Sequence, residues 1–277
     1  MSEYIQTIVR DIDRLEPFPH AAVEVLELAF NDADPAEIVA VLERDPGLTL
    51  KTLRLANSTR YAPRIPVDSI AEAVRRLGSK LIASLALTSG AASYFMGYGV
   101  GTAESNRLLW RECMTIASFA RFISEYLGFA GKDLAYTVGL LQNVGHIVLD
   151  RFVEQELDAI HRYREASMDP LKAERAVLGC DHAQIAARIA TRWGLPPSLV
   201  VGLRWHHDPH AAGGESYLCT IVNAAEGLAY EELAGDCTSL LLPAKLEVYS
   251  SLGLDAATIA ELKSAVRDEL DQLPMAA

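Results

Sequence analysis

The sequence contains little cysteine, and none of it forms a paired motif. The four cysteines, Cys113, Cys180, Cys219 and Cys237, are widely separated and include no C-x-x-C. A chain of 277 residues can bury a large hydrophobic core without covalent cross-links. The sequence therefore predicts reduced thiols and no disulfide framework.

Positive charge is also scarce. The chain has 25 Lys and Arg residues against 37 Asp and Glu residues, which gives a formal net charge of −12. A phosphate backbone repels a protein with this charge, so nonspecific nucleic-acid binding is disfavoured. The N-terminal residues also lack the charged and then apolar pattern of an export signal, so we expect a cytoplasmic protein.

One segment departs from the overall negative charge. Residues 45–80 contain seven basic and three acidic residues, a local charge of +4. The basic residues are Lys51, Arg54, Arg60, Arg64, Arg75, Arg76 and Lys80. A solvated helical face explains such a run, and docking of a partner protein, an acidic segment or a nucleotide is the alternative. We treat these seven residues as a candidate partner-binding patch.

Runs of alternating β-branched residues are absent, so no β-sheet is predicted. Apolar residues recur instead with helical spacing, for example along residues 109–127, where Gly128 ends the pattern. Helix starts are marked by Asp34-Pro35, Asp45-Pro46, Ser69 with Glu72, Asp133, and Asp181 with Gln184. The predicted fold is all-α, with an N-terminal helical bundle over residues 1–103 and a second helical lobe over residues 104–277.

The segment from Leu81 to Ala103 has no charged residue and is long enough to span a bilayer. It also holds five Ser and Thr residues, and glycines at positions 90, 97, 99 and 101. We therefore expect a buried helix rather than a membrane span. The glycines predict that the second half of the segment is a connector.

Histidines occur in two settings that suggest chemistry. His182 follows Asp181 at a predicted helix start, and His206-His207 precede Asp208 and His210. Imidazole binds Fe, Mn or Zn when several ligands converge from different helices. Adjacent residues on a helix diverge by about 100°, so His206 and His207 share one site only with help from local geometry. No G-x-x-x-x-G-K phosphate loop is present.

Several ordered motifs resemble the HD-related output domain (HDOD) family across nearly the whole chain. They are residues 17–19, 38–49, 53–58, 69–74, 77–78, 139–141 and 193–196, followed by His206-His207. The resemblance implies a single HDOD module over residues 1–277 with an HD-like second lobe. It also implies a regulatory role in bacterial signal transduction, through protein partners.

The catalytic relatives of this family are HD phosphohydrolases, including those that cleave cyclic dinucleotides. In them a His, a His-Asp pair, further His residues and a late Asp bind metal and activate water. Carried over by position, the first His falls at Glu112, the His-Asp pair at Gln142-Asn143, and the late acid at Glu226. His182, His206 and His207 are retained. Amide oxygens are poor ligands for these metals and carry no charge, so the resemblance predicts a degenerate site.

The sequence leaves three hypotheses open. The first is a non-enzymatic interaction module without a cofactor, in which Gln142 and Asn143 hydrogen-bond inside the bundle. The second is a residual metal-dependent phosphohydrolase, or a sensor of cyclic dinucleotides or other nucleotides. In it His182, His206, His207 and Glu226, with Glu112, hold a single divalent metal. The third is a DNA-binding regulator, which rests on the basic residues alone. A homodimer is compatible with all three, and His146 either bonds locally or reaches the pocket.

Overall fold

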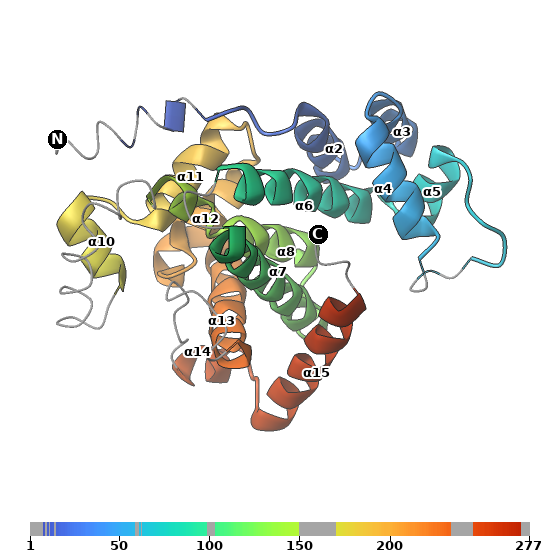
Figure 1. Ribbon diagram of the computed structural model, residues 1–277. Helices are drawn as coiled ribbons and strands as arrows, with labels where there is room; N and C mark the ends of the chain where they lie inside the picture. Colours follow the sequence, from blue (N-terminus) through green and yellow to red (C-terminus); the bar gives the residue numbers. More distant parts are fainter. Residues whose placement is uncertain are drawn as a thin grey trace. The chain divides into compact units, whose positions relative to one another are not determined.

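The computed structural model describes residues 15–58, 61, 63–98, 103–149, 170–233 and 246–272, together with residues 8, 10, 12 and 13. Every regular element within these residues is a helix, which confirms the predicted all-α class (Figure 1). No helix among them is long and apolar enough to cross a membrane. Contacts group residues 17–93 with 193–195 in a smaller unit, and the other described residues in a larger one. The lobes predicted at 1–103 and 104–277 stay a prediction.

The smaller unit contains four short helices and the start of a long one. They are α2 (His20–Phe30), α3 (Pro35–Glu43), α4 (Pro46–Ala56), α5 (Ile70–Leu77) and the first part of α6 (Ser79–Tyr98). Helix α3 packs against α2, α4 and α5. It begins with the predicted capping box, in which Asp34 accepts from the Ala36 N–H at 2.9 Å and Glu37 accepts from the Asp34 N–H at 3.3 Å. This satisfies N–H groups that the first helical turn leaves without partners.

Side chains also cap the starts of α4 and α5, but the cap of α5 differs from the predicted one. Asp45 accepts a hydrogen bond from the Leu48 N–H at 3.0 Å, as an N-cap should. Ser69 accepts from the Glu72 N–H at 3.3 Å, but the Glu72 carboxylate pairs with Arg75. The structure therefore records only half of the capping box predicted at Ser69.

An asparagine side chain joins the two ends of the segment between α4 and α5. The Asn57 amide donates to the Val67 carbonyl at 2.7 Å and to the Leu53 carbonyl at 2.9 Å, and it accepts from the Val67 N–H at 2.8 Å. Val67 also packs with Ala56 and Ala73 in a small buried cluster. The Asn57 side chain thus links the end of α4 to Val67, which lies three residues before α5 begins.

Helix α6 is longer than predicted, because Gly90 and Gly97 lie inside it rather than in a connector. Packing explains Gly90: a Cβ atom there would lie 2.6 Å from the Phe18 ring. The glycine provides room for an aromatic side chain in the core, and the helix continues through it. Gly99 and Gly101 lie outside the described residues.

The larger unit is built around α7 (Ala103–Tyr126), which packs against α8 (Lys132–Leu141), α13 (Ser216–Glu232) and α15 (Ala256–Gln272) (Figure 1). Its other elements are α10 (Pro170–Leu178), α11 (His182–Arg192), α12 (Pro197–Trp205), the 3-10 helix η1 (Pro209–Glu215) and α14 (Leu246–Ser251). Gly128 adopts a φ of +64° just after α7, at the predicted stop. Helix α8 begins two residues earlier than expected, so Gly131 rather than Asp133 is the N-cap and Asp133 lies in the first turn.

Candidate functional site

The larger unit brings together buried histidine and glutamate side chains from several elements. His182 is the first residue of α11, Glu174 lies in α10, and Glu226 lies in α13. His206 and His207 occupy the turn that follows α12. His182, His206 and Glu226 are each at least twenty positions apart in the sequence. The tertiary fold therefore brings these side chains together.

The start of α11 is fixed by a buried carboxylate. Asp181 is fully buried and accepts a hydrogen bond from the Gln184 N–H at 2.7 Å. Its second oxygen accepts from the Arg175 Nε at 2.5 Å. The predicted N-cap is therefore present, and it sets the position of His182 at the next residue.

The Nδ1 atoms of His182, His206 and His207 each lie within 3.3 Å of an oxygen atom. His182 Nδ1 lies 3.0 Å from Glu174 Oε2, which also accepts from the His182 backbone N–H at 2.9 Å. His206 Nδ1 lies 2.9 Å from the Leu203 carbonyl oxygen. His207 Nδ1 lies 3.3 Å from Glu226 Oε2. These contacts fix the orientation of all three rings.

The other ring nitrogens converge. His182 Nε2 lies 3.0 Å from His207 Nε2, and the His206 and His207 ring centroids are 3.9 Å apart. One ring nitrogen from each of His182, His206 and His207 lies within 4.8 Å of the others. The divergence expected for adjacent helical residues is thus overcome, because both histidines lie in the turn beyond α12. His146, Glu174 and His182 form a second such group.

Burial and mutual charge shift the pKa values of this cluster. Burial raises the pKa of Glu174, but the charge and hydrogen bonds of His182 and the charge of His146 lower it to about 2. Burial lowers the pKa of His182, but Glu174, Glu226 and Asp181 raise it above its ordinary value. Burial and the charge of His182 lower the pKa of His206 to about 3, and burial with the neighbouring histidines lowers that of His207.

A glycine lets the segment after α8 approach this cluster. Gly145 precedes His146, whose ring stacks on that of His182 with centroids 4.3 Å apart. A Cβ atom at Gly145 would lie 2.0 Å from the His182 carbonyl oxygen. Only glycine fits this approach of two backbones.

Comparison with known proteins supports the resemblance seen in the sequence. The HDOD domain model matches residues 15–209, which is more than half of the chain. The chain belongs to the HDOD family. An uncharacterized protein from Treponema pallidum (strain Nichols) is 27% identical over 206 residues, or 72% of this chain and 39% of that relative. This HDOD chain therefore spans well under half the length of that relative.

Solved structures share the HDOD fold. A candidate signal transduction protein from Marinobacter aquaeolei VT8 matches with a TM-score of 0.73 and 25% identity, over 98% of this chain and 63% of that one. An HDOD domain protein of unknown function from Geobacter sulfurreducens matches with a TM-score of 0.67 and 21% identity, over 96% of each chain. A candidate phosphohydrolase from Shewanella amazonensis SB2B matches with a TM-score of 0.70 and 23% identity, over 96% of this chain and 94% of that one. The last two show the fold alone.

The resemblance predicted that the His-Asp pair of catalytic relatives falls at Gln142-Asn143, and both side chains are deeply buried in this HDOD protein. Gln142 is 0% exposed and Asn143 1% exposed. Neither polar atom of the Gln142 amide has a hydrogen-bond partner among the described residues, and the same holds for Asn143 Nδ2. The prediction that both amides are satisfied inside the bundle is therefore wrong for Gln142. For Asn143 the prediction is incompletely met, because its Nδ2 atom lacks a partner among the described residues.

The other predicted site residues separate into two groups. His182, His206 and His207 converge, and Glu226 contacts His207. Glu112 is buried in α7, but within the described residues it belongs to neither group of converging ligand atoms.

The structure adds Glu174, which was not predicted, and His146, whose place was left open. No spacing rule pairs Glu174 with His182, because their contact depends on the turn between α10 and α11, where Gly179 has a φ of +83°. A turn of this kind is hard to position from the sequence.

The basic patch lies in the smaller unit and is exposed. Lys51 and Arg54 lie in α4, Arg75 and Arg76 in α5, and Lys80 near the start of α6, while Arg64 precedes α5. All six are exposed. Arg60 lies outside the described residues.

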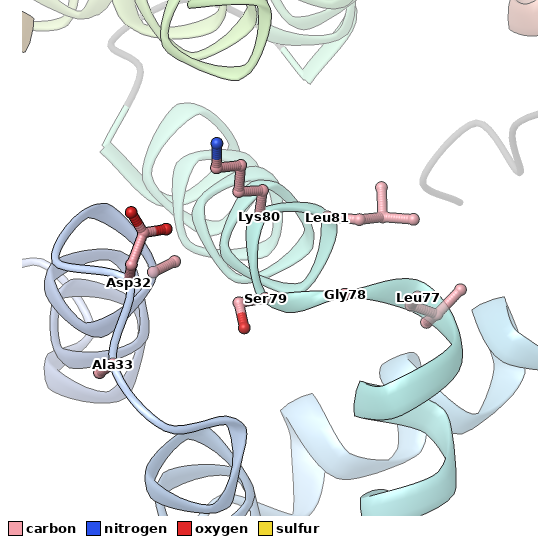
Figure 2. Close-up of a pocket in the computed structure, with 8 residues that line it drawn as sticks. Asp32, Ala33, Leu77, Gly78, Ser79, Lys80 and Leu81 are labelled. Atoms are coloured by element: carbon pink, nitrogen blue, oxygen red, sulfur yellow. The ribbon is translucent and has the colours of Figure 1, made fainter.

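A pocket of about 350 Å³ adjoins one end of this patch. It is lined by Ala29, Asp32, Ala33 and residues 77–81. Figure 2 shows Asp32 and Ala33 on one side and Ser79 and Lys80 on the other. The wall is mostly apolar, with Asp32 and Lys80 as its two charged groups.

Proposed function

We propose that this chain is a non-enzymatic signal-transduction module of the HDOD family that acts by binding protein partners. The observation that carries the proposal is the buried Gln142-Asn143 pair in place of a metal-binding His-Asp pair. Two-metal hydrolysis needs ligands that hold both ions and lower the pKa of bound water. Neutral amides supply no charge and bind these ions weakly, so the proposal requires no catalytic cofactor.

Burial of the HD-like centre supports a non-enzymatic role. The side chains of Gln142, His206 and Glu226 are at most 1% exposed. A phosphodiester substrate must reach such a centre to be cleaved. The centre has the burial of a structural core rather than of an open substrate cleft.

The exposed face of the smaller unit supports partner binding. Ile65 is 80% exposed and follows Arg64 in the sequence, and Leu50 is 50% exposed and precedes Lys51. Exposed apolar side chains next to basic residues suit an acidic protein with a small apolar anchor. The Marinobacter relative is described as a signal transduction protein, which fits this role. Cytoplasmic location and a homodimer are further parts of the proposal.

The first experiment is a phosphodiesterase assay on cyclic dinucleotides with Mn²⁺ or Fe²⁺, using a catalytic HD phosphohydrolase as the positive control. We expect no turnover above the protein-free blank. The double variant Gln142→His/Asn143→Asp introduces the His-Asp pair of the catalytic relatives. Its activity reports whether the remaining residues of the centre can support hydrolysis of cyclic dinucleotides. Metal-dependent turnover by the wild-type chain would overturn the non-enzymatic proposal.

A second experiment tests the surface. A photo-crosslinking residue at Ile65 is expected to capture a partner in cells, and the charge reversals Arg54→Glu and Arg76→Glu should remove that product. The control position is Tyr217 in the larger unit, which is 47% exposed. Equal products from both positions, insensitive to the charge reversals, would contradict the proposed surface.

The second candidate function is a residual phosphohydrolase or a cyclic-dinucleotide or other nucleotide sensor. The convergence of His182, His206 and His207 favours it, because such a group can hold a metal ion. The turnover assay separates hydrolysis from the main proposal. Equilibrium binding of unhydrolysed cyclic dinucleotide, measured by calorimetry, separates sensing.

A further inference from the structure

We propose that the pocket in the smaller unit receives an apolar side chain of a partner peptide, which carries a basic residue on one side of that side chain and an acidic residue on the other. The proposal rests on the partner-binding function proposed above, and it names the kind of sequence that this surface recognises. The pocket has a volume of about 350 Å³. Ligand pockets span about 300–1,000 Å³, so this one suits a side chain of a peptide better than a large cofactor.

The walls of the pocket offer apolar surface that the fold leaves partly uncovered. Ala33, Leu77 and Leu81 line the pocket and remain partly exposed. One edge is formed by Gly78, which has a φ of 80° and a ψ of 154°, a conformation that only glycine adopts readily. Backbone rather than flexible side chains thus fixes the turn from α5 to α6. A preformed apolar pocket favours binding, because little has to be ordered when the ligand enters.

Two opposite charges flank this apolar surface. Asp32 lies on one side of the pocket and Lys80 on the other (Figure 2), and both residues are exposed. The structure records no hydrogen bond or ion pair of either side chain among the residues it describes. A ligand with an acid near Lys80 and a base near Asp32 matches both charges, whereas Asp32 repels a uniformly acidic segment. The pocket therefore selects mixed charge, which the basic patch alone does not.

The backbone at Asp32 indicates that its side chain has a role beyond the end of the helix. Asp32 follows α2 with a φ of 48°, in the left-handed conformation that glycine adopts most easily. The Ala33 N–H donates to the Leu28 carbonyl at 3.0 Å, as in a helix end built around glycine. This bond joins backbone atoms and does not use the Asp32 carboxylate. A glycine would end the helix with less strain, and a ligand at the pocket explains the carboxylate.

A free amino acid carries the same three groups, but it would bind weakly. Exposed ion pairs contribute little to affinity, and so small a ligand has few other atoms to add. A peptide reaches farther, because Leu77 lines the pocket and the adjacent Arg76 is an exposed member of the basic patch. Further acidic residues of the peptide can pair there. A partner peptide is therefore the occupant that gains from both surfaces.

Fluorescence anisotropy with two synthetic peptides tests the proposal on the full chain. The labelled peptides are Lys-Leu-Asp-Glu-Glu and its reverse, Glu-Glu-Asp-Leu-Lys, each with both ends blocked. We expect one of them to bind, and replacement of its leucine by serine should weaken binding by at least about tenfold. Free leucine at about 1 mM should not displace the peptide.

Two protein variants locate the bound peptide. Ala33→Leu fills part of the pocket and should weaken peptide binding at least tenfold, whereas Ala36→Leu, the same change at an exposed position of α3, should not. Asp32→Gly should weaken binding by about two- to fivefold. Its urea midpoint should be unchanged or higher, because glycine suits the left-handed conformation. The same variant should not affect a peptide whose lysine is replaced by glycine.

Binding of neither peptide below about 1 mM, or equal binding by Ala33→Leu and the wild type, would overturn the proposal. Displacement by free leucine at that concentration would assign the pocket to an amino acid and would also overturn it. The product cross-linked at Ile65 in cells separates this inference from the proposed function. A product that persists in Ala33→Leu but disappears with Arg54→Glu would contradict the role of the pocket and leave the proposed function standing.

Discussion

Replacing Gly145 by alanine tests whether the close approach of two backbones builds the histidine cluster. The new Cβ atom would lie 2.0 Å from the carbonyl oxygen of His182, 2.8 Å from its carbonyl carbon and 3.0 Å from its Cα. All three atoms belong to the backbone, so no side-chain rotation relieves the contact. The segment before His146 and the start of α11 must separate by more than about 1 Å to restore van der Waals distances.

The expected cost follows from two opposing contributions. Overpacking of a well-packed core typically costs 1–3 kcal/mol and occasionally more, and a clash with backbone belongs at the upper end. Replacing glycine by alanine where the conformation allows it restores about 0.4–1 kcal/mol, because the unfolded chain loses freedom. We expect Gly145→Ala to lower the free energy of unfolding by about 2–3 kcal/mol. With a urea dependence of about 3 kcal/mol per M, the midpoint should fall by roughly 1 M.

Urea unfolding followed by far-UV circular dichroism measures the effect. The matched control is Gly97→Ala in α6, where no heavy atom lies within 4 Å of the new Cβ. That variant should be as stable as the wild type or more stable by up to about 1 kcal/mol. If Gly145→Ala proved as stable as the control, the close approach to His182 would not exist in solution and the site geometry derived from it would fail.

The remaining predictions concern a cap, a connector and a thiol. Asp181→Ala removes the N-cap of α11 and the partner of Arg175, and it should lower the free energy of unfolding by about 2 kcal/mol, measured in urea. A loss below about 0.5 kcal/mol would show that Asp181 neither caps α11 nor pairs with Arg175 in solution. Asn57→Ala leaves the N–H and the carbonyl of Val67 without their partner, so it should lower the free energy of unfolding by about 1–3 kcal/mol in the same assay. An unchanged urea midpoint would contradict this prediction. Burial, and then neighbouring carboxylates, raise the pKa of Cys180 to about 11, so its alkylation at pH 8 should be about 100-fold slower than that of a cysteine peptide. Mass spectrometry should show this rate rising about tenfold per pH unit towards pH 11, and a plateau near pH 9 would contradict the shift.

The fold could be predicted well because its signals are local. Asp34, Asp45 and Asp181 cap helices as their sequence contexts indicate, since a cap depends on residues two or three positions away. Gly90 was misread as a helix breaker for the opposite reason. Its role depends on Phe18, about seventy positions earlier, and no local pattern shows that the ring packs against this part of the helix.

The candidate site could be predicted only in part. The resemblance to known proteins indicated His182, His206, His207 and Glu226, but the orientation of the rings depends on tertiary contacts. Glu174 meets His182 because a turn redirects the chain after α10. The buried Gln142 shows a further limit, because its lack of a hydrogen-bond partner among the described residues follows from packing that the sequence does not display.

Asn143 stands where the resemblance places an aspartate, and this residue and the geometry of the histidines have a common electrostatic explanation. An aspartate at this position, 1% exposed, would add a negative charge to a centre that already holds Glu174 and Glu226. Leaving such a charge unpaired costs several kcal/mol, so an aspartate would require a second cation. Asparagine removes that requirement and leaves Glu174 and Glu226 as the carboxylates that contact the histidines.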